Sequence, residues 1–195
     1  MNERERKRLE ATAYHEAGHA VAGYLLRRRF EYVTIVPEGD CEGVTEFGPL
    51  DHLIGALVEG AESGPILAYL RQALVTVLAG PTAEERWSGV PQPLEHLWGQ
   101  DALATEDDHA QAIDMAGFIG NNPEDAASVL RDAALEARLL WREPRNWAAV
   151  DVLAAELLQV QRVEGRRARR VIREVLAAAR NRVEGEMPVG EPHDR

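Results

Sequence analysis

The chain has 195 residues, of which 45% are apolar and 28% charged, a composition typical of a soluble globular protein and not of a disordered one. Acidic residues outnumber basic ones 33 to 22, and the resulting net charge of −11 disfavours a nucleic-acid-binding function. A single cysteine excludes an internal disulfide, no apolar run reaches the roughly 18 residues of a membrane helix, and the charged N-terminus does not resemble a signal peptide. We therefore expect a cytoplasmic protein without a membrane segment.

Charge is distributed unevenly along the chain. Residues 31–161 contain six basic and 23 acidic residues, a net charge of −17. Residues 162–182 contain eight arginines against two glutamates, a net charge of +6. We interpret this arginine-rich segment as the solvated face of a helix, with a nucleic-acid contact as the distant alternative.

Periodicity predicts a mainly helical chain. The first elements are a helix over 4–28, a strand over 31–37 and a partner strand over 43–47. Further helices are expected at 50–60, 66–79, 82–87, 102–120, 124–142, 145–163 and 165–183, with Asn122-Pro123 and Pro144 as helix starts. Residues 88–100 are predicted to form a long loop. We expect one mainly α domain with one small β-sheet (α+β) over 1–183, followed by a disordered tail at 184–195.

The first predicted helix contains the motif His-Glu-Ala-Gly-His. Residues four apart lie one above the other on a helix, so His15 and His19 can bind one metal ion. Glu16 is placed to reach a water molecule at the metal and not the metal itself. Gly18, which costs about 1 kcal/mol relative to alanine within a helix, indicates a close backbone approach. The motif predicts a zinc site, with two buried structural histidines as the alternative.

A catalytic zinc site needs a third protein ligand. Candidates are acidic residues and the other histidines: His52, His96, His109 and, in the predicted tail and therefore dismissed, His193. On a helix over 102–120, Asp108 shares a face with apolar residues 112, 115 and 119, where a buried carboxylate needs a partner such as zinc. An aspartate that serves the helix dipole or caps the helix is the alternative.

Four segments resemble the zinc peptidase domain of the FtsH-type, AAA-coupled membrane proteases. AYHEAGHAVAGY matches the zinc helix of that family, VTIVPEGDCEGVTEFGP its strand and turn, LVTVLAGPTAEERWSG a following helix, and EDDHAQAIDMA the helix with its third ligand. The resemblance covers about residues 9–120. It implies an FtsH-like peptidase fold, a Zn²⁺ cofactor on His15, His19 and Asp108, and Glu16 as general base. The sequence departs from the family pattern at Pro81, at Ile113 and in an insertion around 50–63.

Two further carboxylates, Glu84 and Glu85, are candidate site residues. Either could accept the second N–H of a ligating histidine, or replace Asp108 as the third ligand. A pair of surface glutamates on a short helix is the alternative.

These observations predict a stand-alone zinc-dependent endopeptidase. We expect no phosphate-binding loop and no ATPase in this chain, so it would act without ATP on peptides or on flexible or unfolded protein segments, or would use a partner unfoldase. The strand at 31–37 is expected to offer an edge to an extended substrate. The acidic centre favours basic or neutral substrate segments. The alternative is a catalytically weak or inactive peptidase fold that acts as a binding or regulatory module. Both functions are compatible with a homo-oligomer.

Overall fold

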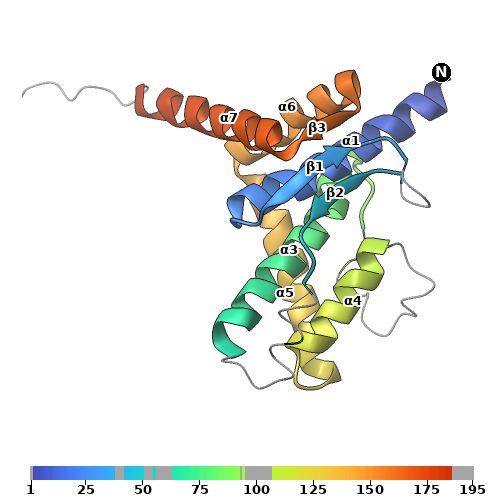
Figure 1. Ribbon diagram of the computed structural model, residues 1–195, viewed down its shortest axis with the longest axis vertical. Coiled ribbons are helices and arrows are strands. Elements are labelled where there is room, and N and C mark those ends of the chain that lie inside the picture. Colours follow the sequence, from blue (N-terminus) through green and yellow to red (C-terminus); the bar gives the residue numbers. More distant parts are fainter. Residues whose placement is uncertain are drawn as a thin grey trace, which may run out of the picture.

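A computed structural model describes residues 2–37, 42–50, 55, 63–92, 94 and 107–185. The elements are α1 (Glu3–Leu25), β1 (Phe30–Thr34), β2 (Val44–Phe47), α3 (Ser63–Ser88), α4 (Asp107–Ile119), α5 (Pro123–Arg142), α6 (Pro144–Val160), β3 (Arg162–Glu164) and α7 (Gly165–Gly185). The strands form one antiparallel sheet in the order β2-β1-β3. Figure 1 shows α3, α4 and α5 in one part of the molecule and α6, α7 and the sheet in the other. The predicted α+β class with one small sheet is confirmed.

Helix α1 joins these two parts. The side chain of Asn2 accepts a hydrogen bond from the backbone of Glu5, and Glu5 reciprocates, which forms a capping box at the start of the helix. The helix ends at Leu25, earlier than the predicted residue 28, because the chain turns at Arg27, whose φ of 61° is left-handed. Between these ends α1 packs on both α3 and α6, so most of its second half is buried.

The sheet has a third strand that the sequence analysis did not predict. The expected helix at 145–163 ends at Val160, where Gln161 takes a left-handed φ of 61°, and β3 follows at once. Val163 pairs with Val33, and Thr34 Oγ1 donates a hydrogen bond to the carbonyl of Gln161. A three-residue strand is too short to show the alternation from which strands are predicted.

Helix α3 is continuous where two helices, 66–79 and 82–87, were predicted. Pro81 lies inside it and removes one backbone hydrogen bond. Thr82 Oγ1 donates to the carbonyls of Leu78 and Ala79 on the preceding turn. This side-chain bonding and the burial of residues 73–83 keep the helix intact.

The remaining predicted helices agree with the structure where it describes them. Asn122 caps α5 and Pro123 and Pro144 open α5 and α6, as predicted. Apart from residues 50 and 55, the predicted helix at 50–60 lies outside the described residues, as do the start of the helix at 102–120 and most of the loop at 88–100. The predicted tail at 184–195 does too, from residue 186 on.

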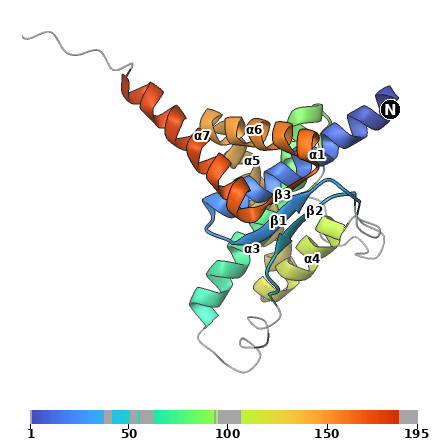
Figure 2. The same ribbon diagram turned by 45° about the horizontal axis from the view of Figure 1, so that its top comes forward.

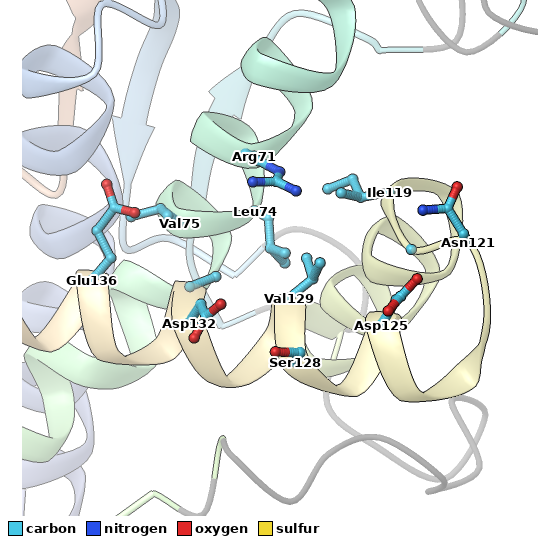
Figure 3. Close-up of a pocket in the computed structure, with 12 residues that line it drawn as sticks. Arg71, Leu74, Val75, Ile119, Asn121, Asp125, Ser128, Val129, Asp132 and Glu136 are labelled. Carbon is cyan, nitrogen blue, oxygen red and sulfur yellow. The ribbon is translucent and has the colours of Figure 1, made fainter. Parts of the chain in front are cut away.

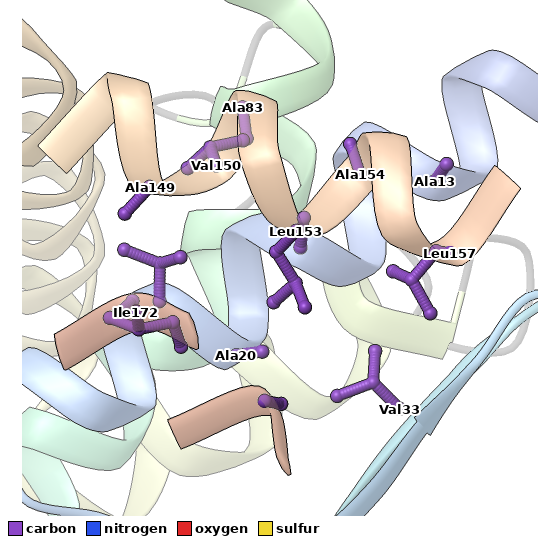
Figure 4. Close-up of a cluster of buried hydrophobic side chains, with 14 of the residues drawn as sticks. Ala13, Ala20, Val33, Ala83, Ala149, Val150, Leu153, Ala154, Leu157 and Ile172 are labelled. Atoms are coloured by element: carbon purple, nitrogen blue, oxygen red, sulfur yellow. The ribbon is translucent and has the colours of Figure 1, made fainter. Parts of the chain in front are cut away.

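Two buried clusters hold the fold together. The first lies where α1, β1, α6 and α7 meet and includes Val33, Leu153, Leu157 and Ile172 (Figure 4). The second joins α3, α4 and most of α5. Trp141 belongs to the first cluster, and its Nε1 donates to Thr82 Oγ1, which connects the end of α5 to α3. Burial of these apolar side chains fixes α1 against α3.

One described helix, α3, is long and apolar enough to cross a membrane by length and composition. However, 67% of its most apolar 18-residue window is buried inside the protein. Because the core helix of a soluble protein can be equally long and apolar, length and composition are weak evidence for a membrane span.

Candidate metal centre

The candidate metal centre begins with a close crossing of α1 and α3. A Cβ atom on Gly18 would lie 2.6 Å from Ala83 Cβ and 2.8 Å from the carbonyl oxygen of Ala79. On the facing helix, a Cβ on Gly80 would lie 2.3 Å from His19 Nε2. The close backbone approach predicted at Gly18 is therefore confirmed, and Gly80 provides the space for the His19 ring.

Two imidazoles from α1 and one carboxylate from α4 converge at this crossing. His15 Nε2 lies 2.7 Å from Asp108 Oδ2, and His19 Nε2 lies 3.0 Å from the same oxygen. The ligand atoms of the three residues all lie within 4.8 Å of one another. The structure thus brings together the three residues that were predicted to bind zinc.

Asp108 reaches this position because of how α4 packs. Residues Ala112, Met115 and Ile119 are buried in the second cluster, which confirms the predicted apolar face. Asp108 lies one turn earlier on that face, in the first turn of the helix, so packing of the apolar row directs its carboxylate toward α1.

The hydrogen-bond partners of the rings require a cation between them and Asp108. The carbonyl oxygen of Thr76 lies 2.8 Å from His19 Nδ1 and can only accept, so Nδ1 carries the ring proton. In a neutral ring, His19 Nε2 then directs a lone pair at the Asp108 carboxylate. Two acceptors at this distance repel each other unless a proton or a metal ion lies between them.

This donor set fits Zn²⁺. Two neutral imidazoles and one carboxylate are typical zinc ligands, and three protein ligands leave a position open for water or substrate. The ligand atoms of the three residues lie close enough together that one ion would contact all of them after small movements of the side chains.

The two glutamates of α3 have different surroundings. Glu84 Oε2 lies 3.1 Å from His15 Nδ1, where it can accept the second N–H of that ring and fix its tautomer. Glu85 does not reach the site: its Oε2 accepts a hydrogen bond from Arg138 Nε at 3.1 Å. Consecutive helix residues project about 100° apart, so only one of the two can face α1.

Glu16 lies beside the histidines but contacts strand β2. Thr45 Oγ1 donates to Glu16 Oε2 at 2.8 Å and also lies 3.1 Å from the Glu16 carbonyl. A Cβ on Gly43 would lie 2.8 Å from Glu16 Cγ, so the chain entering β2 packs directly on this side chain. Glu16 is only 5% exposed, and burial raises the pKa of its carboxyl against the opposing effect of the two histidines.

The electrostatics of the cluster follow from the same contacts. Burial acts to lower the pKa of His15, but the hydrogen bonds to Asp108 and Glu84 outweigh it and hold that pKa well above its usual value. Burial acts to raise the pKa of Asp108, but the two histidines hold it well below its usual range. Without a metal, the centre therefore favours charged imidazoles paired with a carboxylate.

The other histidines do not join this cluster in the part of the chain that the structure describes. His109 follows Asp108 directly, and its Nε2 is buried without a hydrogen-bond partner. His52, His96 and His193 lie outside the described residues.

Three residues of the site were not found by the sequence analysis. Thr76 acts through its backbone carbonyl, which gives no signal in the sequence. Thr45 contacts Glu16 across 29 residues, which only the fold brings together. Gly80 lies between the predicted helices 66–79 and 82–87, where a glycine is typical of a helix end and does not indicate close packing.

The N-terminal part of the chain is similar to known peptidases. A sequence model of peptidase family M41 matches residues 1–89, which contain the two histidines, Glu16 and Glu84 but end before Asp108. The ATP-dependent zinc metalloprotease FtsH of Haemophilus influenzae is 41% identical over 81 residues, covering 40% of this chain and 11% of that protein. The FtsH of a Synechococcus species is 39% identical over 81 residues, with 40% of this chain and 11% of that protein covered.

A longer match reaches beyond the family segment. The chloroplastic ATP-dependent zinc metalloprotease FTSH of Medicago sativa is 35% identical over 107 residues, which cover 52% of this chain and 12% of that protein. The alignments thus span only about a tenth of the length of these relatives. Within that span, the family match and the identity to the relatives show that residues 1–89 are similar to the FtsH-type zinc peptidase domain of peptidase family M41.

Proposed function

We propose that this chain is a zinc-dependent endopeptidase that hydrolyses peptide bonds in flexible or unfolded protein segments. The observation that supports this most directly is the convergence of His15, His19 and Asp108 within 4.8 Å, with Glu16 on the same helix. The similarity to FtsH-type zinc peptidases supports the same chemistry.

His15, His19 and Asp108 would hold the zinc ion. When bound, zinc lowers the pKa of a coordinated water molecule toward neutrality and polarises the carbonyl of the scissile bond. Thr76 and Glu84 hold the outer nitrogens of the two rings, so each ring presents Nε2 inward. Because both rings are oriented before any ligand arrives, little reorganisation is needed when the site is filled.

Glu16 is suited to act as the general base. Its neighbour Thr45 holds one carboxylate oxygen, which leaves the other available to accept a proton from the attacking water. Burial raises the pKa of Glu16, which makes its carboxylate a better proton acceptor and its acid form stable enough to deliver the proton to the leaving amine.

Strand β2 is better placed than β1 to receive the substrate. The predicted edge at 31–37 is wrong, because β1 lies in the middle of the sheet with β2 on one side and β3 on the other. Among the described strands, β2 has an unpaired outer edge, and Gly43 and Thr45 at its start pack on Glu16. An extended segment that adds to β2 would therefore pass beside the general base.

This binding mode selects for unfolded or flexible substrates. A segment must be extended to add its backbone to a sheet edge, and a segment inside a folded domain cannot do so. We propose that such segments are cleaved without ATP hydrolysis by this chain. The excess of acidic residues in 31–161 favours segments that are basic or neutral.

The variant Glu16→Gln tests the proposal. The change is nearly isosteric and removes the base without removing a zinc ligand. Zinc content and melting temperature should stay near wild type, while hydrolysis of unfolded casein, measured without ATP, should fall at least about a hundredfold. The matched control is Glu10→Gln, which changes a half-buried glutamate on the same helix that pairs with Arg6, away from the site.

Two outcomes would contradict the proposal. Equal turnover by wild type and Glu16→Gln would mean that another base or a contaminant is responsible. No turnover by zinc-loaded wild type on any unfolded substrate would favour a binding or regulatory module, or a peptidase that needs a partner unfoldase.

A further inference from the structure

The two faces of strand β2 carry different side chains. Thr45 and Phe47 face α1, since Thr45 donates to Glu16 and a Cβ on Gly23 would lie 2.7 Å from the Phe47 ring. Successive side chains of a strand point to opposite faces, so Glu46 points away from α1, and it is exposed. The face of the sheet opposite α1, which we call the outer face, therefore has a carboxylate on its edge strand.

A β-bulge places a second carboxylate beside the first. The register between β1 and β2 shifts, so that two residues of β1, Glu31 and Tyr32, oppose Glu46 alone. Glu31 is exposed as well, and we call Glu46 and Glu31 the acidic pair. Like charges on opposing strands destabilise a sheet, and neither glutamate has a cationic partner among the described residues. The acidic pair is therefore available to a cation from outside the chain.

Other carboxylates near the sheet already have partners. On β3, Glu164 lies 3.5 Å from Arg162. Just before β2, Glu42 pairs with Arg8 of α1. A cation that arrives at the edge of β2 therefore meets the acidic pair and not these two glutamates.

A substrate segment added to the outer edge of β2 would bring side chains to both faces of the sheet. Figure 2 shows β2 on the outer side of the sheet, with β1 between it and β3. A substrate residue opposite Thr45 would point toward α1 and Glu16, and its neighbour, opposite Glu46, would point to the outer face. Opposing side chains on adjacent strands have Cβ atoms about 5 Å apart. The Glu46 carboxylate is thus within reach of the residue that follows or precedes the one at the general base.

We propose that the acidic pair selects substrate segments that have a lysine or arginine beside the residue that faces Glu16. This inference rests on the proposed endopeptidase function and names its substrate class. A cation opposite Glu46 relieves the repulsion within the acidic pair, whereas an acidic side chain there adds a third negative charge. Val44, half-buried on the same face two residues away, offers an apolar contact to the aliphatic stem of the basic residue.

A second acidic surface acts on substrates in a different way. The groove between α3, the end of α4 and α5 is lined by Asp125, Asp132, Glu136 and Arg71 (Figure 3). None of the described residues that line it belongs to the sheet. Its carboxylates add to the general attraction for basic segments, which does not depend on where the basic residue lies in the segment. A charge change in the groove is therefore a control for a charge change on β2.

Three peptides that differ in one residue test the selection. They share an uncharged, extended sequence around a central lysine, glutamine or glutamate, and a fluorophore and quencher report cleavage at about 0.01 M salt without ATP. For zinc-loaded wild type, kcat/KM should be about tenfold higher for the lysine peptide than for the glutamate peptide. The glutamine peptide should lie between them, and mass spectrometry should place the cleaved bond within about two residues of the lysine.

Variants of Glu46 identify the selecting residue. Glu46→Gln should reduce the preference for lysine, and Glu46→Arg should reverse it, while kcat/KM for the glutamine peptide stays within about twofold of wild type. Glu164→Arg on β3 and Glu136→Arg in the groove make the same charge change elsewhere and should keep the wild-type preference. An unchanged preference in Glu46→Arg, with a wild-type melting temperature, would overturn the proposal. An equal loss of preference in the two controls would also overturn it.

Peptide binding separates this inference from the proposed function. Zinc-loaded Glu16→Gln lacks the proposed general base, so fluorescence anisotropy can measure its affinity for the three peptides without turnover. Tighter binding of the lysine peptide at low salt, lost at about 1 M salt and lost when Glu46→Arg is added, would support the selection. That result would hold even if wild type cleaved none of the peptides, which would contradict the peptidase alone. Cleavage of all three peptides at equal rates would support the peptidase and overturn the selection.

Discussion

Residues 2–88 and residues 107–185 contribute to the candidate metal centre in different ways. The first region supplies His15, Glu16 and His19 from little more than one turn of a single helix, and it holds the match to peptidase family M41. The second region supplies Asp108 alone, from the first turn of α4. One region therefore contains a local motif, whereas the other provides a residue that only the fold brings to the site.

The two regions also position their residues by different physical means. On the α1 side, the site depends on missing side chains: a methyl group on Gly18 or Gly80 would collide with the neighbouring helix or with His19. On the α4 side, an apolar row packs α4 against α3 and carries Asp108 along with it. The first arrangement is sensitive to small additions of volume, and the second to the stability of the whole packed layer.

The largest effect is expected from removing the contribution of the second region. Asp108→Ala leaves two histidines, which are too few for a catalytic zinc site, so bound zinc and casein hydrolysis should both fall to background. His19→Ala should give the same result from the first region. Elemental analysis of the purified variants measures the zinc, and Asp114→Ala, which changes an exposed aspartate on the same helix, is the control.

A different result for Asp108 would change the assignment. If Asp108→Ala retains full zinc affinity while Glu84→Ala loses it, then Glu84 is the third ligand and α4 is not needed for metal binding. The first region would then contain the whole metal site, and the second region would only support it.

The comparison shows how much the sequence could predict. His15 and His19 were predicted as metal ligands because their spacing of four matches the period of the helix that carries them. Asp108 was predicted because a charged residue interrupts an apolar face, which is again a local pattern. The structure brings all three together, although ligation itself stays a prediction.

The features that were not predicted depend on distant contacts. Helix α3 continues through Pro81 because this part of the helix is buried and because the Thr82 hydroxyl adds hydrogen bonds to the carbonyls of Leu78 and Ala79. Helix propensity takes no account of either effect. The central place of β1 depends on β3, a strand of three residues that begins at Arg162, far along the chain from β1, and has no strand pattern of its own. Glu84 and Glu85 are adjacent, and nothing in the sequence indicates which of them faces the site. The orientation of α3 against α1 decides that Glu84 contacts His15 and Glu85 contacts Arg138.

An intermediate effect is expected for the contact between Glu84 and His15, both of which belong to the first region. Glu84→Gln keeps the shape of the side chain but removes the charge that orients the ring and increases its basicity. Zinc affinity should fall about 10–100-fold, measured by competition with a chromophoric chelator. Glu85→Gln is the matched control, because Glu85 pairs with Arg138 and not with the site. A similar loss in both variants would point to an effect of net charge.

The smallest expected effect concerns how the two regions hold together as pH changes. In the metal-free protein, the Asp108 and Glu84 carboxylates hold the pKa of His15 above its usual value, and Asp108 has the same effect on the pKa of His19. A raised folded-state pKa contributes stability that is complete below the unfolded pKa of 6.5 and is lost as pH rises through the folded-state value. The metal-free protein should therefore lose stability as pH rises above about 6.5.

Bound zinc should reverse the direction in which stability changes with pH. Zinc binds neutral imidazoles, so protons compete with it, and affinity and the stability gained from binding both increase as pH rises. Calorimetric melting temperatures measured across the same pH range should fall in excess chelator and rise, or stay level, in excess zinc. The α-amino group and any distant group titrate alike in both conditions, so the difference between the two slopes isolates the centre. If the melting temperature changes with pH in the same way in chelator and in zinc, then zinc does not replace the protons shared by the two histidines and Asp108. In that case the two regions are not joined through a metal.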